Sequence, residues 1–120
     1  MPLRHRINSF KFAFKGIADL FSTQINAKIH LVLGSLAILL GIYLNLNFTE
    51  WAILSITIAV VLAAEAFNTA LEYLTDLVSP NYHQLAGKTK DVAAAGVLLT
   101  AFGAIFVAIF LFLPKIILLF

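Results

Sequence analysis

Four polar side chains recur at helical spacing along one apolar segment of the sequence. Glu65, Asn68, Glu72 and Asp76 share one narrow face of an α-helix, in which each residue advances by about 100°. The rest of the segment is mostly valine, leucine, alanine, isoleucine and phenylalanine, which suit contact with lipid or other helices. Acidic and amide side chains on such a helix are costly in a membrane unless they face a site. These four residues, here called the polar stripe, are therefore the first candidates for chemistry.

Charged residues follow the polar stripe after a short polar loop. They are the basic Lys88 and Lys90 and the acidic Asp91. Magnesium binds one or two protein carboxylates together with phosphate oxygens, and a lysine offsets phosphate charge. A deeper carboxylate, Glu65, can accept a proton from a hydroxyl held at the membrane surface. The sequence has neither a P-loop motif nor a kinase-type glycine loop. By themselves, these residues predict only an acidic and basic site that suits phosphate chemistry.

Composition places the chain in a membrane. The sequence has 120 residues, of which 62% are hydrophobic and only 12% are charged, and this is too apolar for a soluble domain of its size. It contains no cysteine, so disulfides and thiolate chemistry are excluded. We expect one all-α membrane domain over residues 1–120.

Hydrophobic periodicity predicts four helices. The first, 1–23, has one apolar face and basic residues elsewhere, which is typical of an amphipathic helix in the membrane interface. A polar hinge at 23–30 leads into spanning helices expected at 29–46, 51–78 and 92–113. Asn47 or Thr49 is expected to cap the second span, a polar loop is expected at 79–89, and Pro114 is expected to end the third span. Gly34 and Gly41 share a face of the first span and favour close packing.

The basic residues predict the orientation of the chain. Three spans put the two termini on opposite sides of the membrane. One side then holds every lysine and arginine except Lys115. Because positive charge concentrates on the cytoplasmic side, we expect a cytoplasmic N-terminus and a polar stripe that opens toward the cytoplasm.

The segments around the polar stripe form one long motif. It reads Glu65-x-x-Asn68-Thr69-Ala70-x-Glu72-x-x-x-Asp76, then Tyr82-His83, then Ala86-Gly87-Lys88-x-Lys90-Asp91-x-Ala93-Ala94-Ala95, with Lys15-Gly16 and Ile29-His30 upstream. This pattern resembles the prokaryotic diacylglycerol kinase family, which includes the undecaprenol kinases. The resemblance implies a homotrimer of three-span subunits in the bacterial inner membrane, with active sites shared between neighbours. It also implies phosphorylation of a lipid hydroxyl that depends on Mg²⁺ and ATP, and no nucleic-acid partner is expected.

The resemblance also assigns roles to individual positions. Glu65 matches the catalytic base, and Asn68 matches an amide that orients the base or the lipid hydroxyl. Glu72 matches a carboxylate for metal and nucleotide, whereas Gln24 stands where the family often has a second metal-binding glutamate. An amide oxygen can still coordinate Mg²⁺, but it brings no charge to the ion. The other positions that match nucleotide-site residues are Asp76, Asn81, His83, Lys90 and Asp91.

The acceptor and the function class have alternatives. Ile29-His30 resembles the undecaprenol kinase branch, whereas an acidic residue tends to occupy position 30 in the diacylglycerol branch. Undecaprenol is therefore the favoured acceptor, and diacylglycerol is the alternative. A small oligomeric proton- or ion-conducting subunit would use Glu65 but not Glu72, Lys90 or Asp91, and a holin-like pore former would need no ordered stripe.

Single residues also have simpler interpretations. Glu65 alone would serve as a structural acid paired with a neighbouring helix, and Asp76 would only close its own helix. His30 and His83 would be interfacial residues without chemistry, His30 more so than His83. The Thr69 hydroxyl would bond back to its own helix.

Overall fold

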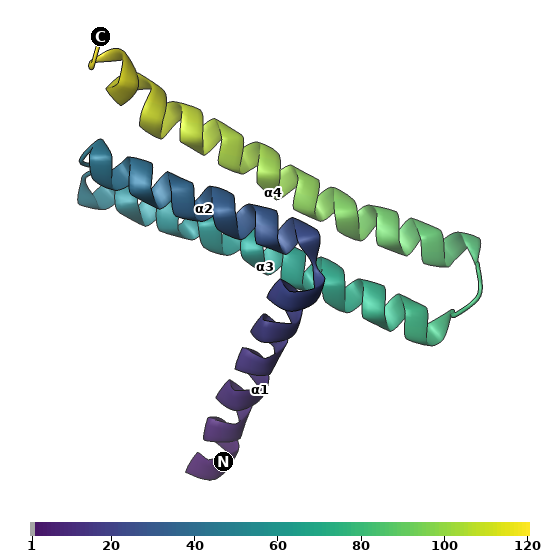
Figure 1. Ribbon diagram of the computed structural model, residues 1–120. Helices are drawn as coiled ribbons and strands as arrows, with labels where there is room; N and C mark the ends of the chain where they lie inside the picture. The colour runs from purple at the N-terminus through teal and green to yellow at the C-terminus, as the bar shows by residue number, and fades with distance from the viewer. Residues whose placement is uncertain (1) are drawn as a thin grey trace.

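The computed structural model describes residues 2–120, and this part of the chain consists of four α-helices without a strand. The helices are α1 (Leu3–Thr23), α2 (Ile25–Tyr43), α3 (Phe48–Val78) and α4 (Gln84–Ile117). Helices α2, α3 and α4 run along one another, whereas α1 leaves the bundle at a steep angle (Figure 1). The all-α prediction is confirmed, and residue 1 of the expected first helix lies outside the described residues.

Three helices are long and apolar enough to cross a membrane, namely α2, α3 and α4. At 1.5 Å per residue, α3 with its 31 residues is about 46 Å long, and it exceeds a hydrocarbon layer of about 30 Å. Helices α3 and α4 also project past α2 at the end that carries their connecting loop (Figure 1). The chain is therefore a multi-pass membrane protein, and α3 is longer than the apolar layer that it would cross.

The hinge and the end of the first span differ from the prediction. Only Gln24 interrupts the helices α1 and α2, because its backbone is extended with φ −102° and ψ 113°. Helix α2 begins at Ile25 rather than at 29, since the polar residues 26 and 28 are compatible with a helix at the membrane surface. It ends at Tyr43 rather than at 46, because Asn45 has a φ of 55° and the Leu46 N–H bonds to the Gly41 carbonyl at 3.1 Å.

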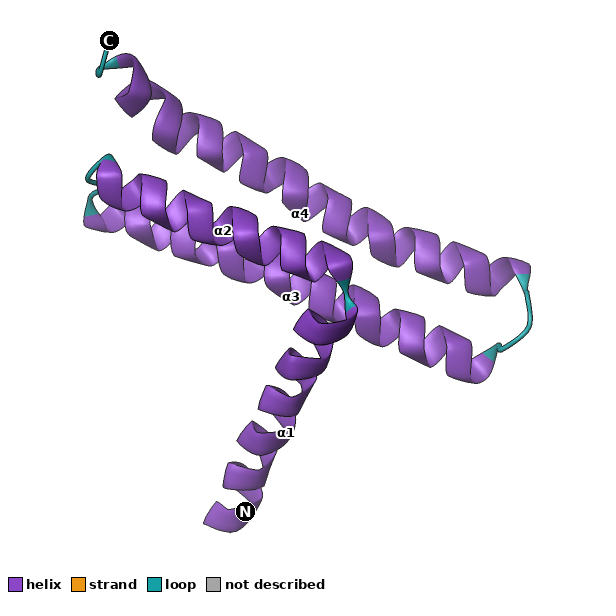
Figure 2. Cartoon of the chain, viewed as in Figure 1, coloured by secondary structure: helices purple, strands orange, loops and turns teal. Residues whose placement is uncertain are grey.

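The α3 and α4 boundaries also differ, and side-chain caps explain two of the differences. Helix α3 begins at Phe48 rather than at 51, where Asn47 Oδ1 accepts the Glu50 N–H at 2.9 Å. Helix α4 begins at Gln84 rather than at 92, where His83 Nδ1 accepts the Leu85 N–H at 3.1 Å. The predicted loop at 79–89 is therefore only 79–83, as Figure 2 shows.

The prediction that Pro114 ends the last helix is wrong. Helix α4 continues through Pro114 to Ile117. Only one turn follows the proline, and within that turn Lys115 Nζ lies 3.3 Å from Glu50 Oε2 at the start of α3. This ion pair joins the last turn of α4 to the first turn of α3.

Little of the chain is buried, and the core lies at the end of the bundle that carries the α2–α3 turn. Its buried members are Leu44, Leu46, Leu54 and Phe112. Large apolar side chains elsewhere on the spanning helices are mostly exposed. This surface suits contact with lipid or with other copies of the chain.

Gly41 permits a close approach of α2 to Leu46 and Trp51 beside this core. A Cβ atom at Gly41 would lie 2.9 Å from both Leu46 Cδ1 and the rigid Trp51 ring, whereas one at Gly103 in α4 would meet nothing within 4 Å. We expect Gly41→Val to destabilise the folded protein in detergent by about 1–3 kcal/mol, the usual cost of overpacking. Gly103→Val is the control, because both changes add valine to a helix. Equal thermal unfolding of the two variants would contradict the prediction.

Contacts between α1 and α3 attach the first helix to the bundle. The Tyr73 hydroxyl donates to Asp19 Oδ2 at 2.7 Å, and Thr23 Oγ1 lies 3.4 Å from the same hydroxyl. Leu20 of α1 is buried beside them. Because Tyr73 follows Glu72 directly, α1 is attached to the same part of α3 that carries the polar stripe.

Candidate active site

Helix α3 presents the polar stripe with exposure that rises along its length. Glu65 is 2% exposed, Asn68 and Glu72 are partly buried, and Asp76 is exposed near the end of the helix. No β-branched run or proline interrupts α3 here, so the four side chains keep the common face that their spacing predicts. The stripe therefore connects the interior of the bundle to its surface at the α3–α4 loop.

Glu65, the deepest acid, faces a histidine from another helix. His30 Nε2 of α2 lies 3.3 Å from Glu65 Oε1, and their side chains are 19% and 3% exposed. Oε1 makes no hydrogen bond within residues 2–120, although Nε2 lies this close to it. The sequence interpretation of His30 as an interfacial residue does not account for this contact.

A signal for the contact is present in the sequence. His30 and Glu65 are both titratable residues inside apolar segments, and the α2–α3 turn joins those segments. The distance from the α2–α3 turn to His30 along α2 is similar to the distance from that turn to Glu65 along α3. The two distances differ by about one turn of helix. This comparison would have placed His30 beside the polar stripe.

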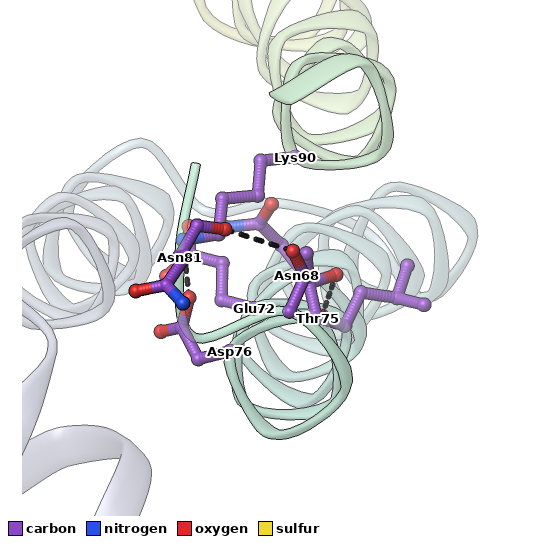
Figure 3. A network of polar contacts seen from close by, with 8 residues as sticks. Asn68, Glu72, Thr75, Asp76, Asn81 and Lys90 are labelled. Carbon is purple, nitrogen blue, oxygen red and sulfur yellow. Dashed lines mark hydrogen bonds and ion pairs between the residues drawn. The ribbon is translucent and has the colours of Figure 1, made fainter. Parts of the chain in front are cut away.

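The middle of the stripe is held by an amide. Asn68 Nδ2 donates to Glu72 Oε1 at 3.3 Å, as Figure 3 shows. Asn68 Oδ1 is buried without a hydrogen-bond partner in residues 2–120, and so is Thr69 Oγ1. The prediction that Thr69 bonds back to its own helix is therefore wrong, and this residue instead lines a cavity between α1 and α3. Unpaired buried polar atoms are costly, so both atoms are candidates for contact with a bound group or a neighbouring subunit.

An ion pair connects the outer end of the stripe to α4. Lys90 Nζ lies 2.5 Å from Asp76 Oδ1, and Figure 3 shows the lysine reaching across from its helix toward α3. The structure thus brings a basic residue of the motif onto the stripe. Its neighbour Asp91 is exposed and makes no side-chain contact with the stripe among the interactions of the described residues.

Three other predicted site residues lie apart from the stripe within one chain. Asn81 is exposed in the loop, where its backbone carbonyl accepts the Ser79 hydroxyl at 2.8 Å. His83 is exposed and uses Nδ1 to cap α4. Gln24 donates from Nε2 to Thr23 Oγ1 at 3.1 Å, and no hydrogen bond joins it to Glu72. The site of a single chain therefore contains Glu65, His30, Asn68, Glu72, Asp76 and Lys90.

The side chains fit a magnesium ion that also binds phosphate, rather than an ion enclosed by protein. No group of three histidine, aspartate or glutamate side chains in residues 2–120 is arranged to hold a metal. Glu72 nevertheless offers a partly buried carboxylate that Asn68 orients. Mg²⁺ commonly binds through one or two carboxylates, with water and substrate phosphates as its other ligands.

A hollow lies beside the stripe between α3 and α4. Its volume is about 660 Å³, and Asn68, Lys88 and Thr89 are its polar residues. The rest of its lining is apolar, namely Ala64, Phe67, Leu71, Leu85, Val92, Ala93, Gly96 and Val97. An apolar hollow with a few polar groups at one side suits an amphipathic ligand.

Fold and site together define a three-span membrane protein with an acidic and basic site on one side. Residues 11–112 match the family described as prokaryotic diacylglycerol kinase. The chain belongs to this family.

Named relatives include kinases of two lipid alcohols. The chain is 41% identical over 107 residues to a diacylglycerol kinase of Synechocystis, with 88% of this chain covered and 61% of the relative's length. It is 31% identical over 113 residues to the undecaprenol kinase of Bacillus subtilis, with 94% of this chain and 92% of the relative's length covered. It is 26% identical over 99 residues to the diacylglycerol kinase of Escherichia coli K12, with 82% of this chain and 81% of the relative's length covered.

Proposed function

We propose that the protein is a membrane lipid kinase that transfers the γ-phosphate of ATP to the hydroxyl of a lipid alcohol. Family membership supports this function, and one observation carries it for this chain. A buried carboxylate, Glu65, shares a helix face with Asn68, Glu72 and the Asp76–Lys90 pair. This arrangement would supply a proton acceptor within the membrane and charged groups for a nucleotide at its surface.

In the proposed reaction, Glu65 accepts the proton of the lipid hydroxyl. The hydroxyl oxygen then forms a bond to the γ-phosphorus, the bond from that phosphorus to the β–γ bridging oxygen breaks, and ADP leaves. Asn68, whose Oδ1 has no partner within residues 2–120, would orient the hydroxyl. Lys90 would leave Asp76 and bind phosphate oxygens. Bound Mg²⁺, held by Glu72 with Gln24 as a neutral oxygen ligand, would offset phosphate charge. Asp76, Asn81, His83 and Asp91 would border the nucleotide.

We further propose undecaprenol as the acceptor, with diacylglycerol as the alternative. The Ile29-His30 pair supports this choice, and so does the match to the Bacillus subtilis undecaprenol kinase, which covers 94% of this chain and 92% of that relative. The test is a comparison of kcat/KM for the two lipids with purified protein in the same mixed micelles. A higher kcat/KM with undecaprenol supports the proposal, and a higher value with diacylglycerol reverses the assignment.

The proposed assembly is a homotrimer in the bacterial inner membrane, with cytoplasmic N-termini and sites shared between subunits. The exposed apolar surface of the spanning helices supports assembly. Within one chain, Lys90 contacts Asp76, which lies about 16 Å along α3 from Glu65. Because the γ-phosphate must approach both the base and the lysine, a lysine from a neighbouring subunit would complete each site.

Subunit mixing tests the shared sites. We expect Glu65→Gln and Lys90→Ala proteins to be inactive alone and to regain part of the activity after they are unfolded, mixed and reassembled. Some mixed sites would then draw an intact acid from one chain and an intact lysine from another. Each variant reassembled with itself is the control. If mixing is verified with two affinity tags and no activity returns, each site is built within one chain.

A further inference from the structure

The Glu65 carboxylate is buried beside one histidine. Its side chain is 3% exposed, and Oε1 has no hydrogen-bond partner in the described part of the chain. Neighbouring polar groups on α3 do not reach it, because Asn68 donates to Glu72 and the Thr69 hydroxyl makes no hydrogen bond. Within the described residues, the one ion-pair contact of Glu65 is with His30 of α2.

A buried carboxylate requires a donor to keep one orientation. An unpaired carboxylate in a membrane interior is costly, and a hydrogen bond to a charged group contributes more than one between neutral groups. His30 Nε2 lies 3.3 Å from Oε1, which is close to the distance of an N–H···O hydrogen bond. The imidazole is therefore placed to supply the donor that Oε1 lacks.

We propose that His30 is a positioning residue for the proton acceptor, an inference that rests on the proposed kinase function. The Nε2–H group donates to Oε1 and holds the carboxylate in one rotamer. The other oxygen, Oε2, remains free to take the proton of the lipid hydroxyl while the imidazole keeps its own proton. Because His30 and Glu65 belong to different helices, the contact also links the placement of α2 to the reactivity of α3.

The first test compares two substitutions of His30 in the full-length protein. His30→Leu removes the donor, and we expect kcat to fall by about 10- to 100-fold with an unchanged KM for Mg-ATP. His30→Gln retains an N–H donor of similar reach and should recover most of that loss. His5→Leu is the control, because His5 is exposed on α1, and it should leave kcat unchanged.

The second test separates positioning from a general structural role. In a Glu65→Gln background, His30→Leu should cause little further loss, since the carboxylate that His30 orients is absent. If His30→Leu lowers kcat by the same factor in the Glu65→Gln protein as in the wild-type protein, the inference is overturned. A normal kcat per folded trimer in His30→Leu, or a loss confined to the KM for Mg-ATP, would also overturn it.

The third test probes the contact without activity. The chain has no cysteine, so His30→Cys combined with Glu65→Cys can be bridged by a short thiol-specific crosslinker. The pair should crosslink, whereas His30→Cys with Phe67→Cys should not, because Phe67 is exposed and faces the α3–α4 hollow. Crosslinking of both pairs alike, or of neither, would overturn the contact.

The outcomes also distinguish this inference from the proposed function. If the wild-type protein phosphorylates a lipid alcohol and His30→Leu keeps its kcat, only the inference fails. If the wild-type protein phosphorylates no lipid alcohol, the proposed function fails and the inference with it, whether or not the cysteine pair crosslinks.

Discussion

Glu65→Gln is expected to lower turnover by about 10²- to 10⁴-fold while Mg-ATP still binds, because the amide keeps the shape of the side chain but cannot accept a proton. The buried position of Glu65 on the polar stripe makes it the acid that a lipid hydroxyl would meet within the apolar layer. Turnover is measured with saturating lipid alcohol, and nucleotide binding is measured separately by calorimetry.

Glu50→Gln is the matched control for this variant. Glu50 lies on the same helix and is also partly buried, but it pairs with Lys115 at the opposite end of α3. Its substitution should affect stability more than turnover. Near-normal turnover in Glu65→Gln would remove Glu65 from the role of base.

Glu72→Gln is expected to raise the Mg²⁺ concentration for half-maximal rate by about 10- to 100-fold, because Mg²⁺ favours charged oxygen ligands and Glu72 is the partly buried acid of the stripe. Gln24→Glu should lower that concentration by adding a charge beside the ion. Gln24→Ala should do less harm than Glu72→Ala. The measurement is a magnesium titration of the initial rate at fixed ATP.

The same titration tests the position of residue 24. Within one chain, Gln24 contacts Thr23 rather than Glu72, so the proposed ligand role of Gln24 would require a neighbouring subunit or a bound nucleotide. If neither Gln24→Glu nor Gln24→Ala changes the Mg²⁺ concentration for half-maximal rate, residue 24 does not contribute to the metal site. If Glu72→Gln also leaves that concentration unchanged, the metal assignment is wrong as a whole.

The sequence predicts the helices well and their ends less well. Long apolar periodicity is enough to locate α2, α3 and α4, because spanning a membrane requires helices of this length. The ends depend on single side chains that periodicity does not report. His83 caps α4, which begins eight residues before its predicted start. Lys115, in the extra turn that follows Pro114, pairs with Glu50 of α3.

The candidate site was predictable where it lies on one helix. The spacing of Glu65, Asn68, Glu72 and Asp76 predicts their common face, since a helix fixes which residues share a side. Contacts between helices were harder to predict. The approach of His30 to Glu65 depends on the relative depth of two helices, and the unpaired Thr69 hydroxyl depends on the packing of α1 against α3.

The most direct test of the central claim is transfer of labelled phosphate into lipid. Purified protein in lipid nanodiscs would be given ATP with a radiolabelled γ-phosphate, Mg²⁺ and undecaprenol or diacylglycerol, and the lipid would then be extracted and counted. The kinase proposal predicts label in the extracted lipid alcohol that depends on the added acceptor and is lost in Glu65→Gln. Absence of label with either acceptor, from folded wild-type protein that binds Mg-ATP, would contradict it.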